Sequence, residues 1–222
     1  MAGKFSLDGI IYKIENSEAF VYGLTNPNVN SVVIPSHVQG YRVTEIKHKA
    51  FYGSKIKTIT LPNSIIAINE SAFEECKNLL SVIQLGSYST RAIAIDGYAF
   101  CKCVKLQRLT LKHDMLLLGQ KHFAFCESIQ TLPPIYGVSS FFDGAFYNCN
   151  KLTTLEFVGP HKLLLGDNTF SNCPNLKNFK FLCKVAVTPY VLRLLADANI
   201  YVEKDNKQLT DLAYMGYNVI LV

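Results

Sequence analysis

The sequence predicts an α/β repeat solenoid, in which stacked coils share one continuous core. Six phenylalanines recur at intervals of 22, 27, 23, 23 and 24 residues: Phe51, Phe73, Phe100, Phe123, Phe146 and Phe170. Alanine precedes four of them, and cysteine follows five of them three positions later. A second motif, apolar-x-x-apolar-x-apolar, begins about six residues after the phenylalanine. Two coupled motifs at one period are typical of repeat proteins, whose units bury their apolar faces only against their neighbours.

The apolar motif predicts one short strand in every coil, because alternation with a period of two is typical of a half-buried strand. We expect about seven such strands in one parallel sheet. Six copies read Val29-Val32-Ile34, Ile56-Ile59-Leu61, Leu79-Val82-Leu85, Leu106-Leu109-Leu111, Leu152-Leu155-Phe157 and Leu176-Phe179-Phe181. The fifth coil carries Pro133-Pro134 instead, and proline removes a hydrogen-bond donor from a sheet. We therefore expect a break or a very short strand there.

The phenylalanine half of each repeat is expected to return along the other side as tight turns or a short helical segment. A large apolar residue stands five positions before each phenylalanine: Ile46, Ile68, Ile95, Leu118, Phe141 and Leu165. Met115–Leu117 and Leu163-Leu164 add more apolar residues than the repeat needs. We expect them to pack into the core; if they were exposed, they would form a self-association patch.

Both ends of a solenoid need caps, because an open end exposes the core and unpaired strand groups. We expect an N-terminal β cap at 1–28, repeats at 29–181 and a C-terminal cap at 182–222, all in one domain. The first cap has a hairpin signal, Asp8-Gly9, between Phe5–Leu7 and Ile10–Ile14, with a further strand at Ala19–Leu24. In the second cap, the sequence predicts a helix from Thr188-Pro189 to about Ala198 and a strand at Ile200–Val202. It then predicts a helix from Asp205 to Met215, ended by Gly216, and a final strand at Tyr217–Val222.

Composition excludes several classes of protein. With 49% apolar residues the chain is not disordered, and a net charge of +5 from 22 basic and 17 acidic residues is too mild to indicate nucleic-acid binding. No apolar run approaches the roughly 18 residues of a membrane span, so we expect no membrane insertion. The N-terminus carries no signal-peptide pattern, which favours the cytoplasm if Met1 is the native start.

The cysteines at one slot per coil predict a buried ladder of reduced thiols: Cys76, Cys103, Cys126, Cys149 and Cys173. Cys183 lies outside this slot and is the expected exposed thiol. Cys101 and Cys103 do not indicate a zinc site, because Cys103 is a ladder residue that points inward. His122 replaces the usual alanine, and we interpret it as a turn substitution rather than a catalytic partner of Cys126. Phosphate-loop and hydrolase motifs are missing from the sequence, so we expect no catalytic residue, metal or cofactor.

Leu-x-x-Leu-x-Leu followed by Ile-x-x-x-Ala-Phe-x-x-Cys-x-x-Leu resembles the repeat of the BspA-type leucine-rich repeat family, over roughly residues 29–181. The resemblance implies a right-handed superhelix with a parallel sheet on its concave face. It also implies protein binding, often on the surface of bacteria and protists, where adhesion is the usual role. A cell-surface or secreted location would follow from it.

The outward residues of the strands are the candidate binding surface, because a rigid, preformed sheet lowers the ordering cost of binding. Threonine and glutamine supply hydrogen bonds, and the basic residues suit an acidic or neutral polypeptide. The predicted site comprises Lys57, Thr58, Thr60, Gln107, Arg108, Thr110, Gln130, Thr153, Thr154, Glu156, Lys177 and Lys180. We expect a protein or extracellular-matrix ligand there. Two alternatives remain: a structural protein that self-assembles as a homo-oligomer, and an intracellular scaffold.

Overall fold

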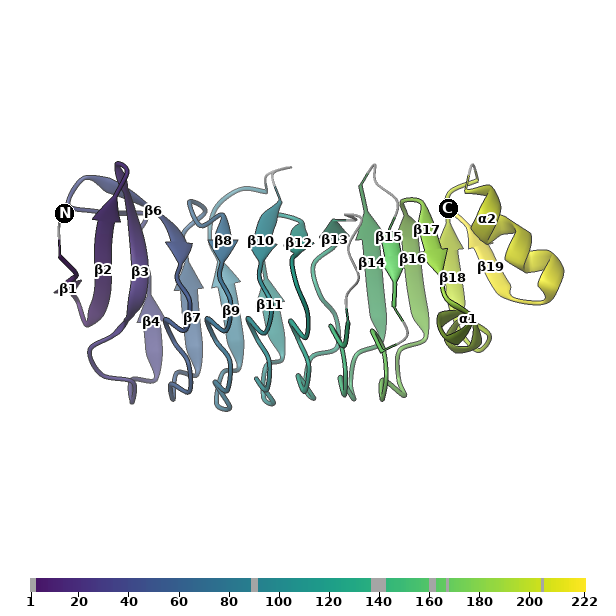
Figure 1. Ribbon diagram of the computed structural model, residues 1–222, viewed down its shortest axis with the longest axis horizontal. Helices are drawn as coiled ribbons and strands as arrows, with labels where there is room; N and C mark the ends of the chain where they lie inside the picture. The colour runs from purple at the N-terminus through teal and green to yellow at the C-terminus, as the bar shows by residue number, and fades with distance from the viewer. Residues whose placement is uncertain (1–2, 89–91, 137–142, 160–162, 167, 205) are drawn as a thin grey trace.

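The chain winds into β-coils that stand side by side in a row between two caps (Figure 1). The structure, a computed structural model, describes residues 3–88, 92–136, 143–159, 163–166, 168–204 and 206–222. A complete coil contains two short strands and a turn built around one of the repeating phenylalanines. No helix in these described ranges is both long and apolar enough to cross a membrane.

The predicted strands pair in parallel, and we call this row of strands the first ladder. Its first part is a four-stranded sheet of β4 (Ser31–Val33), β7 (Thr58–Leu61), β9 (Ser81–Gln84) and β11 (Arg108–Thr110). Its second part contains β14 (Thr154–Val158), β16 (Asn178–Leu182), β18 (Asn199–Val202) and β19 (Asn218–Leu221). Equivalent positions of the motif lie opposite one another, so that Ile59 pairs with Val82 and Val82 with Leu109. The apolar side chains of these positions therefore stack on the buried side of the ladder. The third apolar residue predicted for β9 is an exception: Leu85 is 55% exposed, and Gln84 takes the buried position opposite Leu61.

The fifth coil interrupts the first ladder, as its two prolines predict. The coil keeps a single bridge, between Thr131 and Thr154, in place of a strand. After the prolines comes β13 (Ile135–Tyr136), whose Ile135 pairs with Met115 on one side and Phe157 on the other. The four-stranded sheet consequently ends at β11.

A second ladder of short strands lies on the phenylalanine side, where the sequence indicated only turns or helix. It contains β6 (Tyr41–Ile46), β8 (Ala67–Ile68), β10 (Ile93–Ile95) and β12 (Met115–Leu117), while β15 (Leu163–Leu165) pairs with β17 (Val185–Val187). Met115 and Leu117 are buried, as expected, whereas Leu116 between them is only partly buried. Leu118, the apolar residue five positions before Phe123, is 39% exposed, whereas Leu117, one residue earlier, is fully buried. Phe141 and the side chains of Leu163 and Leu164 lie outside the described part.

The repeating phenylalanines form a continuous stack through the core. Ring centroids of successive coils are 5.0 to 6.0 Å apart, and the rings lie within 11° of parallel. The backbone N–H of Phe73 donates to the carbonyl of Ala99 in the next coil at 2.8 Å, and Phe100 donates to His122 in the same way. The turn residues two positions before and after Phe73, Ser71 and Glu75, have φ of 55° and 60°. This left-handed backbone on both sides makes a tight turn rather than a helix.

The ladder cysteines are hydrogen-bond donors as well as small apolar residues. Each thiol donates to the carbonyl of the phenylalanine in the preceding coil, at 2.9 Å from Cys76 to Phe51 and 3.1 Å from Cys103 to Phe73. Cys126, Cys149 and Cys173 repeat this contact with Phe100, Phe123 and Phe146. All seven cysteines are free thiols. A thiol at this slot therefore satisfies a buried carbonyl that alanine would leave with one bond fewer.

The expectation that Cys183 is the exposed thiol is wrong. Cys183 is 8% exposed and packs in the core, whereas Cys173 is only partly buried. The C-terminal cap covers Cys183, and the Asn206 side chain donates to its carbonyl at 3.0 Å.

The N-terminal cap is an antiparallel meander of β1 (Phe5–Leu7), β2 (Ile10–Glu15) and β3 (Glu18–Leu24). Asp8 and Gly9 both have positive φ in its first turn, as the predicted hairpin requires. β3 pairs in parallel with β6, which also pairs with β5 (His37–Val38), so the cap extends the second ladder.

The C-terminal cap holds helix α1 (Pro189–Leu195), which is shorter than expected, with Thr188 accepting the Val191 N–H as N-cap. The second predicted helix is divided into α2 (Lys207–Thr210) and a 3-10 helix (Asp211–Met215), ended by Gly216 at φ 88°. The predicted start of that helix, Asp205, lies outside the described residues.

Replacing Phe100 with alanine should lower the free energy of unfolding by about 3–5 kcal/mol, because it opens a cavity between two stacked rings. The matched control is Phe125→Ala, since Phe125 is partly exposed and contacts Tyr147 edge-on; it should cost less than about 1.5 kcal/mol. Urea unfolding measures both values. Equal losses would contradict a core that depends on the phenylalanine stack.

The buried thiols should make the fold sensitive to alkali. Burial raises the pKa of Cys76, Cys101 and Cys183 to about 11 from an ordinary value of 9.0. Above pH 9 the unfolded chain therefore loses thiol protons that the folded chain keeps. The free energy of unfolding should then fall as the pH rises from about 9 to 11, by up to about 1.4 kcal/mol per pH unit for each such thiol.

Urea unfolding at a series of pH values measures this decline. Cys101→Ala removes one of these thiols, so its decline should be shallower than that of the unchanged chain. An unchanged free energy of unfolding up to pH 11 would rule out this effect of the thiols.

Candidate functional site

The predicted site residues lie on or beside the first ladder, between its buried positions, and we call this surface the strand face. It comprises the outward residues of β7, β9, β11, β14 and β16, the residue that precedes each strand, and Ser128, Gln130 and Lys151 around the interrupted fifth coil. Lys57, Gln107, Arg108, Gln130 and Lys177 are exposed, and the other predicted residues, Thr58, Thr60, Thr110, Thr153, Thr154, Glu156 and Lys180, are partly buried. The strand register aligns Thr58 with Ser81 and Ser81 with Arg108.

The fifth coil divides the strand face into two groups. Residues from Lys57 to Thr110 belong to the four-stranded sheet, whereas Thr153 to Lys180 belong to β14, β16 and the residues before them. Gln130 lies between the groups, and its carbonyl accepts the Thr153 N–H at 2.9 Å.

Hydrogen bonds between neighbouring coils fix many side chains of the strand face. Thr58 donates to the Ser31 hydroxyl at 3.0 Å. Beyond the fifth coil the equivalent positions hold asparagines: Asn199 donates to Asn178 at 2.8 Å, and Asn218 donates to Asn199 at 2.6 Å. This row of asparagine side chains was not predicted from the sequence. Its signal is an asparagine directly before an apolar residue, repeated in Asn178-Phe179, Asn199-Ile200 and Asn218-Val219.

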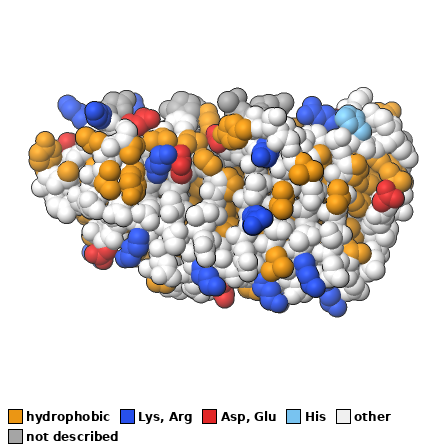
Figure 2. Space-filling model, turned by 180° about the vertical axis from the view of Figure 1, so that it is seen from behind, with side chains coloured by type: hydrophobic (Ala, Val, Ile, Leu, Met, Phe, Trp, Pro, Cys, Tyr) orange, Lys and Arg blue, Asp and Glu red, His pale blue; other side chains and the backbone are white. Residues whose placement is uncertain are grey.

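The predicted basic residues are not equivalent in charge. Lys180 pairs with Glu156 at 3.2 Å across neighbouring strands, so these two side chains largely neutralise each other. Lys57, Arg108 and Lys177 are exposed, and the described residues provide none of them with an ion pair. The face seen in Figure 2 carries separate basic side chains, mixed with acidic and hydrophobic ones, rather than a continuous basic surface.

An open polar hollow of about 510 Å³ lies next to the fifth-coil break. Its walls contain three predicted residues, Gln107, Arg108 and Gln130, together with Leu80, Ser81, Ser128 and Lys151. Lys151 is exposed, and among the described residues it has no ion pair. The prediction omitted Ser128 and Lys151. Lysine before the first apolar residue of the strand motif, as in Lys55-Ile56, Lys105-Leu106 and Lys151-Leu152, is the signal that could have found Lys151.

His122 and Cys126 do not form a nucleophile and its base in this geometry. His122 is fully buried with its Nε2 atom 2.9 Å from the Leu118 carbonyl, and burial lowers its pKa to about 4. Burial raises the pKa of Cys126 well above its usual range, and its thiol donates to Phe100. Both side chains are therefore neutral at pH 7 and directed to the backbone. The described residues also contain no cluster of three or more histidine, cysteine or acidic side chains that could hold a metal ion.

Several solved structures share this fold. A leucine-rich repeat protein of T. pallidum matches with a TM-score of 0.67 at 23% identity, covering 99% of each chain. A leucine-rich cell surface protein from Faecalibacterium prausnitzii gives 0.65 at 20% identity, covering 82% of this chain and 55% of that one. A leucine-rich repeat protein from Bacteroides ovatus gives 0.51 at 22% identity, covering 91% of this chain and 66% of that one.

The sequence itself identifies the family. No curated protein matches the chain. A family model for the BspA type leucine rich repeat region, however, matches it in six copies, over residues 13–93 and 87–192. These ranges include the phenylalanine turns, the cysteine slots and the strands of the first ladder from β4 to β16. The chain therefore belongs to the BspA-type leucine-rich repeat family.

Proposed function

We propose that this chain is a non-enzymatic interaction module that binds a partner protein through its strand face. Its family consists of repeat modules for protein interaction or structural roles. The observation that carries the proposal is the polar hollow beside the fifth coil, because it combines two exposed cations with hydrogen-bonding side chains on a preformed sheet. A rigid surface of this kind binds without the entropy cost of ordering itself.

The side chains of the hollow favour an acidic partner segment. Arg108 can hold a carboxylate through two parallel hydrogen bonds, and Lys151 adds a second positive charge on the same hollow. Gln107, Gln130 and Ser81 offer both donors and acceptors for the backbone of a bound segment. The partner we propose is a protein with exposed aspartate or glutamate, either cellular or from the extracellular matrix.

Self-assembly is the second candidate, and the C-terminal end of the row favours it. Tyr214 and Met215 are 92% and 68% exposed there, and Leu221 and Val222 are each more than half exposed. β19 is also the last strand of its sheet, with no strand beyond it in the described residues. Concentration-dependent association that is unaffected by changes on the strand face would favour this candidate.

Reversing the two charges of the hollow should abolish partner capture. The immobilised Arg108→Glu/Lys151→Glu variant is compared with the unchanged chain for the proteins that each retains from cell lysate and from matrix extract. Loss of two charge-assisted contacts should weaken binding by about 30-fold or more. The matched control is Lys204→Glu/Lys207→Glu, which makes the same charge change on exposed residues of the C-terminal cap.

A protein retained by the unchanged chain and the control, but lost with the hollow variant, is the expected result. Equal retention by all three chains would place the binding site elsewhere. Recovery of the chain alone, from both sources, would instead support self-assembly.

A further inference from the structure

We propose a second binding site at the N-terminal end of the first ladder, where the free edge of β4 accepts one extended peptide strand. β4 is the outermost strand of its four-stranded sheet and pairs only with β7. The Thr58 N–H donates to the Asn30 carbonyl, and the Ile34 N–H donates to the Thr60 carbonyl. The groups of Asn30, Val32 and Ile34 therefore face β7.

The groups of Ser31 and Val33 face the opposite way, because alternate residues of a strand direct their backbone groups to opposite sides. Both residues are exposed, and Val33 is 64% exposed. Among the described residues, none forms a backbone hydrogen bond with Ser31 or Val33 on this side. Two N–H groups and two carbonyls are thus left in position for a further strand.

The free edge of β4 lacks the sequence features that usually prevent an edge strand from pairing with another chain. Charged side chains, prolines and bulges commonly block the pairing of an edge strand. β4 reads Ser31-Val32-Val33, with no charge or proline and a regular register against β7. Pro35, two residues after Val33, limits the strand at one end. The geometry favours a short peptide over a long sheet extension.

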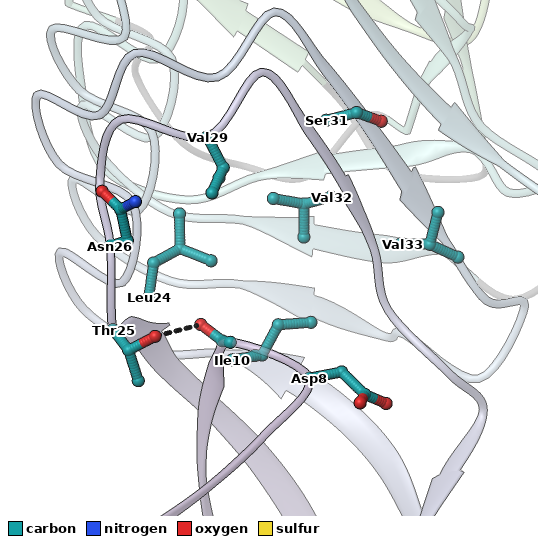
Figure 3. A pocket seen from close by; sticks show the side chains of 10 residues that line it. Asp8, Ile10, Leu24, Thr25, Asn26, Val29, Ser31, Val32 and Val33 are labelled. Atoms are coloured by element: carbon teal, nitrogen blue, oxygen red, sulfur yellow. Dashed lines mark hydrogen bonds between the residues drawn. The ribbon is translucent and has the colours of Figure 1, made fainter.

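A hollow of about 160 Å³ beside this edge can take one side chain of the peptide. Figure 3 shows Leu24, Val29 and Val32 around the same space, with Ile10 on the side of the N-terminal cap. The side of the hollow formed by Gly9 and Thr25 is held in place by two hydrogen bonds. Thr25 donates from its N–H and its hydroxyl to the Gly9 carbonyl, at 2.9 and 3.3 Å. Apolar cavities of about 150 Å³ hold a small hydrophobic group, so the hollow matches a valine, isoleucine or leucine side chain.

Asp8 defines the charge of the bound peptide. It is exposed, lines the same hollow and has no ion pair with any described residue. A lysine or arginine two residues away from the aliphatic residue lies on the same face of the strand and would meet this carboxylate. The occupant is therefore an extended basic-aliphatic segment of a partner protein. Such strand addition derives affinity from main-chain bonds and specificity from the pocket.

The test uses a fluorescein-labelled peptide that places one valine and two lysines on the same face of a strand, Thr-Lys-Thr-Val-Thr-Lys, and measures its fluorescence anisotropy on titration with the full chain. Val33→Pro removes the outward N–H, and an edge strand accepts proline where that group faces solvent. This variant should bind about tenfold more weakly, because a partner carbonyl loses its donor. The matched control, Val33→Thr, keeps the N–H and should bind as the unchanged chain does.

Two further variants keep the result interpretable. Val29→Phe fills the hollow and should weaken binding even if Val33→Pro lowers the urea midpoint. Arg108→Glu/Lys151→Glu, on the strand face, should leave binding unchanged. The proposal is overturned if the peptide does not bind at concentrations up to about 1 mM, if Val33→Pro and Val29→Phe both fold and bind it as well as the unchanged chain does, or if only the strand-face variant loses it.

Discussion

Hydrogen bonds between successive phenylalanine turns are the constraint on which the remaining structure depends. The N–H of Phe73 donates to Ala99 in the next coil, and the thiol of Cys103, also in that coil, donates to the Phe73 carbonyl. A buried polar group without such a partner would cost about 1–3 kcal/mol. Each coil therefore satisfies the backbone of its neighbour, and the stacked rings fix the spacing at which it does so. The strands of both ladders pair because this spacing is maintained.

The sequence was sufficient to predict the features that repeat with the phenylalanines. Ile59 and Leu109 are inward residues of strands because alternation is visible within each motif. The second ladder was missed because strands such as Ala67–Ile68 are too short to show a period. The burial of Cys183 depends on how the C-terminal cap packs, and no local pattern encodes that contact.

The candidate site was predictable only in part, because some of its contacts join residues of different coils. Alternation identified Arg108 and Gln130 as outward residues, but Lys151 joins them only across the interrupted fifth coil. The pairing of Lys180 with Glu156 likewise depends on the register of neighbouring strands. One irregularity, the two prolines, ends a sheet and leaves a polar hollow beside it. A local loss of regular pairing thus creates the feature that distinguishes one stretch of an otherwise uniform surface.

The common register of β4, β7, β9 and β11 fixes the distance between any two positions along the row of coils. The free edge of β4 and the hollow beside β11 are therefore held at a fixed separation, because adjacent strands are spaced by about 4.8 Å. Gain or loss of one whole coil between these two sites would increase or decrease their separation by one strand spacing. Neither cap would need to change, since each contacts only the coil beside it. Duplication of a coil is therefore a route by which this architecture can alter its reach in discrete increments.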